Sequence, residues 1–347
     1  MVFDPPRCPN TACRQHVQPM RGFYRRCGFY YPKCRTVGVP RFRCRTCKRG
    51  FSRQTFRHDY GDHRPEVNVP CFMLLVSGVG LRQAARFLVM NPRSVQDKKR
   101  KMARTFGYLH GNLCPSLPSE RTYLLDEEET YEGASIRPLT MPVLIEKKTW
   151  FVVATAVGSI RRLAKAGSAR RARQERDELS GRRPDQSNEC VRQVLSVLAQ
   201  KAPRGGVTLS TDCKASYATI ARGVFGDRLV HETTLGTLLR NTKNPLFAIN
   251  TTLAMTRDNC GRLRRRSWLV TKKAERLQNH LQLFTIYRNY VRRRFNRDKE
   301  SDTPAKFLGL LPRNLHPQEV LAWRQDWGDL SIHPMSCTGL RTVRQPA

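Results

Sequence analysis

Paired cysteines at the start of the chain place the strongest constraint on how it folds. Six of the 12 cysteines fall within the first 47 residues. Cys44 and Cys47 have the two-residue spacing that lets a tight turn direct both thiolates at one ion, and Cys8 and Cys13 form a wider second pair. Structural zinc takes four such ligands and stabilises a module too small to have a sufficient core. The pattern predicts a zinc-ribbon-like module over residues 1–62 with these four ligands. Cys27 and Cys34 are alternatives to the first pair.

The residues around Cys44 and Cys47 indicate how this module folds. Residues 41–43 and 48–51 are typical of two short strands that flank the turn. Arginines and aromatic residues are frequent in the same region: Arg21, Phe23, Tyr24, Arg25, Arg26, Phe29 and Tyr30. They suit contact with the phosphates and bases of nucleic acid. The aromatic side chains are equally suited to form the core of so small a module.

The charge balance of the chain indicates a polyanionic partner. Its 347 residues include 63 Lys and Arg against 28 Asp and Glu, a formal net charge of +35. Nucleic acid and an anionic membrane surface both fit this charge. The sequence has no apolar run of about 18 residues or more and no apolar signal segment at its start. We therefore expect a nucleic-acid partner, no membrane, and a cytoplasmic, nucleoid-associated location, where cysteines are more often metal ligands than disulfides.

Residues 63–118 have the pattern of a helix-turn-helix. Four apolar residues at i, i+3, i+4 and i+7 share one helix face: Leu81, Ala84, Ala85 and Leu88. Asn91 and Pro92 suit the N-cap and the first position of the next helix. The basic residues of that helix are Arg93, Lys98, Lys99, Arg100, Lys101 and Arg104. We expect this helix to present them to DNA; a linker bundle with a solvated basic face is the alternative.

A cluster of acids interrupts this basic sequence. Residues 121–125 are typical of a strand, and Asp126, Glu127, Glu128 and Glu129 follow directly. Clustered carboxylates repel one another, which suggests that a cation lies between them. A solvated acidic loop after the strand is the alternative.

A second predicted strand also ends at an aspartate. Residues 207–211 are strand-like and lead to Asp212, which is equally suited to cap the helix expected over 213–221. Further strands are expected at 137–144 and 149–157, a helix at 188–200, and a long helix at 272–295 with Glu275 near its start. Residues 159–185 form a basic insertion, either an ordered phosphate-contacting segment or a flexible loop.

Four groups of residues occur in a characteristic order along the chain: 42–47 with 51–56, 126–132 with 137–140, 211–212, and 262–268 leading into 274–277. In this order they resemble the DDE transposases of bacterial insertion sequences that carry an N-terminal zinc ribbon. The resemblance extends to about Arg294. The first cysteine pair is spaced more widely than in the family, and the glutamates that crowd Asp126 are candidates to share its metal.

The resemblance implies a multidomain protein. Its α/β catalytic domain, over residues 119–300, would be RNase H-like: a mixed five-stranded sheet with helices on both faces. A tail follows over 301–347. The implied catalytic triad is Asp126, Asp212 and Glu275, which would hold two Mg²⁺ or Mn²⁺ ions beside the structural Zn²⁺. The implied DNA-binding residues include Arg264, Arg265 and Arg266.

The implied function is metal-dependent cleavage at the ends of a DNA element, followed by transfer of the 3′-hydroxyl into target DNA. Two Mg²⁺ ions about 3.5–4 Å apart activate the attacking oxygen and stabilise the leaving one, and Mg²⁺ prefers carboxylate oxygens. The partners would be double-stranded DNA, as terminal inverted repeats and target, and further copies of the chain in a homo-oligomer. Two alternatives stay open: a catalytically inactive zinc-ribbon and helix-turn-helix regulator, and a structural or RNA-binding basic protein.

Overall fold

A mixed sheet forms the centre of the protein in the computed structural model, which describes residues 3–31, 38–264 and 269–323. Its order is β6-β5-β4-β8-β9, with the short β7 paired to β5. β5 runs antiparallel to its neighbours, whereas β8 is parallel to β4 and β9 is parallel to β8. The strands are β4 (Thr122–Tyr131), β5 (Pro138–Glu146), β6 (Val152–Thr155), β7 (Gly158–Ser159), β8 (Val207–Asp212) and β9 (Leu229–Thr234). The expected mixed sheet is therefore present, with β7 as a sixth strand.

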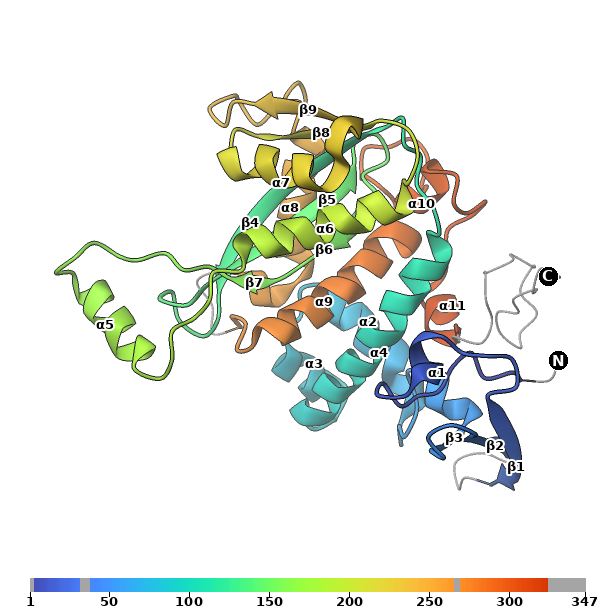
Figure 1. The fold of residues 1–347 in the computed structure, drawn as a ribbon. Helices are drawn as coiled ribbons and strands as arrows, with labels where there is room; N and C mark the ends of the chain where they lie inside the picture. Colours follow the sequence, from blue (N-terminus) through green and yellow to red (C-terminus); the bar gives the residue numbers. More distant parts are fainter. Residues whose placement is uncertain (1–2, 32–37, 265–268, 324–347) are drawn as a thin grey trace.

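Helices cover both faces of this sheet (Figure 1). Successive strand residues point to opposite faces, so Leu125 packs into one apolar cluster and Leu124 into another. The first cluster contains residues of α6 (Ser187–Lys201) and α7 (Ala215–Phe225), and the second contains residues of α8 (Phe247–Asn259). Residues of α9 (Ala274–Ile286) enter both clusters. The expected long helix at 272–295 is shorter than predicted and ends in a π-helical turn, Tyr287–Val291.

Three helices form the region predicted as a helix-turn-helix: α2 (Asn68–Val76), α3 (Leu81–Phe87) and α4 (Pro92–Leu113). The Asn91 side chain accepts a hydrogen bond from the N–H of Arg93 at 2.8 Å, so the predicted N-cap is present. These helices share one apolar cluster with the sheet. The turn before α3 also lies against α8, because a Cβ at Gly78 would stand 2.4 Å from the Asp258 carbonyl oxygen. The predicted domain boundary at residue 118 therefore does not separate two hydrophobic cores.

The N-terminal region has a core of its own. An antiparallel sheet joins β1 (Tyr24–Tyr30), β2 (Val39–Cys44) and β3 (Gly50–Ser52), with the short helix α1 (Arg14–Val17) beside it. The two strands predicted around the cysteine turn correspond to β2 and β3. The buried aromatic residues are Phe3, Phe23, Phe42, Phe51 and Phe56. Phe23 thus belongs to the core, whereas Phe29 is 63% exposed.

A short C-terminal helix packs on the body of the protein. It is α11 (Pro317–Ala322), which follows the short α10 (Pro304–Phe307) and leads to Trp323, 1% exposed. The remainder of the tail, residues 324–347, lies outside the described residues. Within the described part, no helix is both long and apolar enough to span a bilayer.

A half-buried histidine makes stability depend on pH. His110 Nε2 lies 3.0 Å from the Val153 carbonyl oxygen and therefore donates to it, so Nδ1 accepts from the Tyr290 hydroxyl at 2.9 Å. Burial lowers the pKa of His110 to about 4. Since a histidine in the unfolded chain has a pKa of about 6.5, the unfolded state binds more protons between these values, and stability falls as pH decreases through this window.

We expect the free energy of unfolding, measured in urea at pH 7 and pH 5, to fall at the lower pH. His110 contributes up to about 1.4 kcal/mol per pH unit. His110→Gln should remove this part of the slope, while His63→Gln, at an exposed position, should leave it in place. Equal slopes in the wild type and His110→Gln would contradict the assignment.

Candidate active site and zinc centre

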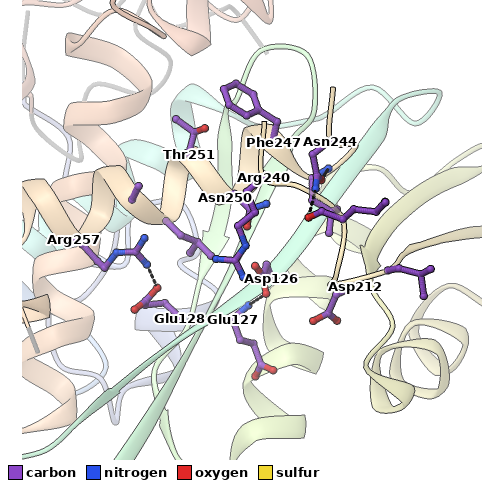
Figure 2. A pocket seen from close by; sticks show the side chains of 16 residues that line it. Asp126, Glu127, Glu128, Asp212, Arg240, Asn244, Phe247, Asn250, Thr251 and Arg257 are labelled. Atoms are coloured by element: carbon purple, nitrogen blue, oxygen red, sulfur yellow. Dashed lines mark hydrogen bonds and ion pairs between the residues drawn. The ribbon is translucent and has the colours of Figure 1, made fainter. Parts of the chain in front are cut away.

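Neighbouring parallel strands bring Asp126 and Asp212 together. β4 and β8 pair Leu124 with Ser210. Two residues further along each strand, the aspartates occupy adjacent positions on the same face, because side chains alternate along a strand. Both line an open cavity of about 700 Å³ (Figure 2). Asp212 is the last residue of β8, as predicted.

The position of Asp126 within its strand differs from the prediction. β4 continues to Tyr131, so Asp126 and the glutamates after it belong to the strand and do not form a loop. The polar residues were expected to end the strand, but β5 pairs with β4 along its whole length, from Tyr123 to Tyr131. These backbone hydrogen bonds extend the strand through the acidic residues.

The three glutamates beside Asp126 are bound by cations of the protein itself. Glu127 points to the opposite face of the sheet, where it contacts Lys214 and accepts from Tyr217 at 2.9 Å. Glu128 pairs with Arg257 on α8, and both guanidinium ends of Arg162 donate to Glu129, at 2.7 and 3.0 Å. The glutamates are therefore poor candidates to share a metal with Asp126.

The two aspartates have a different set of partners. Among the described residues, neither makes an ion pair. One oxygen of each accepts a backbone N–H, from Glu127 to Asp126 at 2.7 Å and from Lys214 to Asp212 at 3.1 Å. The second oxygen of each carboxylate accepts no hydrogen bond within the described residues, and both side chains line the cavity. This leaves two adjacent carboxylates able to bind an external cation.

The environment of Asp126 raises the pKa of its carboxyl group. Burial is the largest cause that raises its pKa, to about 6, and the charges of Asp212 and Glu127 act in the same direction. The N–H of Glu127 and the charge of Arg240 oppose this shift. A divalent ion between Asp126 and Asp212 would offset both the burial and the repulsion.

Helix α8 contributes residues to the cavity that the sequence analysis did not assign. Asn250, Ala254 and Arg257 lie at i, i+4 and i+7 and line the cavity from one helix face. Figure 2 shows Asn250 beside Arg240, close to Asp126. The spacing of these three residues could have identified this helix face from the sequence. The helix was not predicted, because adjacent threonines in this segment weaken the helical pattern.

The predicted third acid lies away from this cavity. Glu275 is exposed in the first turn of α9, and its neighbour Ala274 donates a 2.8 Å hydrogen bond to Glu132. Glu132 is six residues beyond Asp126 in extended chain, which corresponds to about 20 Å. The structure therefore brings together two members of the predicted triad and not the third. His231 on β9 contacts the Thr211 hydroxyl at 2.9 Å.

The basic face predicted on α4 is only partly available to DNA. Arg93, Arg100 and Arg104 are exposed and follow one helix stripe. Lys98 is buried and donates to Asp62, Arg64 and Asn68, and Lys99 is buried and donates to the Arg276 carbonyl at 3.0 Å. Lys101 is held by Asp62 at 2.7 Å. The three lysines face inward because α4 packs against α9 and residues 58–68.

The second group of predicted DNA-binding residues follows α8. Arg264 is exposed, while Arg265 and Arg266 lie outside the described residues.

The four predicted zinc ligands converge in the N-terminal region. The sulfur atoms of Cys8, Cys13, Cys44 and Cys47 all lie within 4.8 Å of one another, and the Cys8–Cys47 and Cys13–Cys44 pairs are 3.5 and 4.0 Å apart. Tetrahedral zinc with Zn–S bonds of about 2.3 Å requires sulfurs about 3.8 Å apart. Four cysteines in this arrangement could bind zinc. Cys27 is outside the cluster and Cys34 is outside the described residues.

Comparisons with known proteins provide little further guidance. No family model matches the sequence, and no curated protein matches it either. Among solved structures, the chain is similar to one in the simian T-cell lymphotropic virus intasome in complex with PP2A regulatory subunit B56 gamma. The match covers 80% of this chain and 79% of that chain, at 9% sequence identity and a TM-score of 0.29. A TM-score this low does not establish a shared fold.

Proposed function

We propose that the protein is a DDE-type DNA transposase with an RNase H-like catalytic domain. It would cleave DNA at the ends of a mobile element and join the freed 3′-hydroxyl to target DNA. The observation that carries this proposal is the pair Asp126 and Asp212, which line one cavity and make no ion pair within the described residues, in a chain with a net charge of +35. A mixed sheet with helices on both faces supports the fold, and the four-cysteine cluster supports the family resemblance.

The cavity residues have distinct roles in this proposal. Asp126 and Asp212 supply carboxylate oxygens for Mg²⁺ or Mn²⁺, and Asn250 replaces Glu275 as the third ligand, through its amide oxygen. When bound, the two ions would lower the pKa of the attacking water or 3′-hydroxyl and stabilise the leaving oxygen. Arg240 lines the same cavity and would contact the DNA phosphate. Arg257 fixes α8 on β4 through Glu128.

The DNA partner and the assembly belong to the same proposal. The exposed stripe of Arg93, Arg100 and Arg104 would bind the terminal inverted repeats, with the zinc ribbon beside it. Target DNA would enter at the cavity, and copies of the chain would assemble on paired element ends in the bacterial cytoplasm. An inactive regulator that kept only the DNA-binding helices remains the second candidate, because one of the three predicted acids is absent from the cavity.

A nicking assay tests the proposed function. We expect the full-length protein to nick duplex DNA that carries the flanking inverted repeats when Mg²⁺ or Mn²⁺ is present, and to lose this activity in EDTA. Sequence-selective binding to the repeats without nicking in either metal would favour the regulator. Equal binding to RNA and to unrelated DNA, again without nicking, would favour a general basic nucleic-acid-binding protein.

A further inference from the structure

A basic arm extends from the body of the protein between β7 and α6 (Figure 1). We define the arm as residues 160–185; its only helix in the described chain is α5 (Ala169–Glu178). On α5 only Gln174 is buried. All residues of this helix are polar or charged apart from Ala169 and Ala172. A helix without an apolar face is not held in place by a hydrophobic core.

Polar contacts fix the arm to the strand that carries Asp126. Arg162 binds Glu129 of β4 through two hydrogen bonds, and Arg183 binds Glu132 at 3.0 Å. At the far end of the arm, Asp177 accepts from Arg137 at 2.8 and 2.9 Å. Gln174 accepts from the N–H of Ala164 and donates to the carbonyl of Arg162. The arm therefore contacts β4 and the residues between β4 and β5 at several points along its length.

Every acidic residue of α5 forms an ion pair, but not every cationic residue of the arm does so within the described chain. Glu175 pairs with Arg171, Asp177 with Arg137 and Glu178 with Arg161. Four exposed cations in the arm have no hydrogen bond or ion pair from their side chains among the described residues: Lys165, Arg173, Arg176 and Arg182. Arg182 also lines an open cleft of about 460 Å³ together with Arg161 and Arg183.

We propose that this arm binds the sugar–phosphate backbone of duplex DNA without regard to sequence. The inference rests on the proposed action on DNA and assigns it a second contact surface, separate from the cavity and from α4. Four unpaired cations on an arm that contacts β4 suit phosphates, which position a protein on DNA. Single-stranded DNA is a poorer fit, because its binding usually needs aromatic platforms for the bases, and residues 160–185 contain no aromatic side chain.

Two quadruple variants with equal loss of charge test the arm. The first replaces Lys165, Arg173, Arg176 and Arg182 with Gln. The control replaces four exposed cations elsewhere that also lack a side-chain partner in the described chain: Arg204, Arg222, Arg297 and Lys299. Each variant loses three arginines and one lysine, so any difference between them reports the location of the charge.

The measurement is the dissociation constant for a duplex of random sequence, over salt concentrations of about 50–200 mM. Each phosphate contact contributes about −0.9 to the slope of log K against log salt, so the arm variant should have a slope shallower by about 3–4 and the control by less than about 1. Affinity for a duplex with the inverted repeats should fall by the same factor as for random DNA. An arm variant with the slope of the control would overturn the inference, and an acidic protein would then be the better partner for the arm.

This experiment separates the two proposals. Wild-type protein that binds no DNA and shows no metal-dependent nicking would contradict the proposed function. Wild-type protein that binds and nicks DNA, together with an arm variant that keeps the wild-type slope, would contradict the arm alone.

Discussion

Asp126→Asn should lower the rate of Mg²⁺-dependent nicking by about three orders of magnitude or more. The substitution keeps the size of the side chain and its acceptor for the N–H of Glu127. It removes the negative charge that would hold the metal. A metal site supplies several kilocalories per mole of transition-state stabilisation, and about 4 kcal/mol corresponds to a factor of about 10³ in rate. DNA affinity should stay within a few-fold of wild type, because the basic surfaces are unchanged.

Three further substitutions establish which residues form the site. Asp212→Asn should resemble Asp126→Asn, since the two carboxylates occupy adjacent positions on β4 and β8. Asn250→Ala should also lower the nicking rate, whereas Glu275→Gln should leave it at the wild-type value. The rates are compared at saturating Mg²⁺ and again in Mn²⁺. Full activity in Asp126→Asn would remove the proposed function, and loss of activity in Glu275→Gln would return Glu275 to the site.

Cys44→Ser should abolish zinc binding and unfold the N-terminal region. Structural zinc contributes about 10–16 kcal/mol of apparent binding free energy to small modules, and the aromatic core around Phe42 is too small to replace it. Burial raises the pKa of Cys47, but hydrogen bonds with the Arg49 backbone, Asn10, Cys8 and Cys44 lower it to about 6. One ligand is therefore a thiolate near neutral pH. The remainder of the protein should stay folded, since its apolar clusters contain no residue of this region.

Cys27→Ser provides the matched control for zinc binding. Cys27 lies on β1 in the same small sheet, but it is not among the four clustered sulfurs. We expect one equivalent of zinc in the wild type and in Cys27→Ser, and less than about 0.1 equivalent in Cys44→Ser. Zinc is measured by metal analysis of the purified proteins, and folding of the region by hydrogen exchange. A full equivalent of zinc in Cys44→Ser would show that Cys44 is not a ligand.

Local patterns predicted the features that depend on neighbours in the sequence. The spacing of Cys44 and Cys47 specifies a turn, and Asn91 followed by Pro92 specifies the start of α4. Asp212 was placed correctly because a short β-branched run has few alternatives to a strand. Each of these features depends on a few consecutive residues, and the backbone of those residues has only a small set of conformations.

Other predictions required knowledge of which elements pack together. Lys98 and Lys99 belong to a basic sequence, yet they are buried, because α4 packs against residues 58–68 and against α9, where the two ammonium groups bind protein oxygens. The strand was expected to end at Asp126, but pairing with β5 extends it through the glutamates that follow. Which side of a helix or strand faces solvent depends on the elements that pack against it. A single sequence does not identify those elements.

The sequence alone predicted the four cysteines that cluster, the strong positive charge and the two aspartates at strand positions. The tertiary structure decided which acids make ion pairs within the described residues and which side chains line the cavity beside the aspartates. Ion pairs such as Glu128 with Arg257 join residues far apart in the chain, and their formation removes a carboxylate from the candidates for metal binding. Because electrostatic interactions act across space and fall off with distance, only the fold could distinguish Asn250 in the cavity from Glu275 on a distant helix turn.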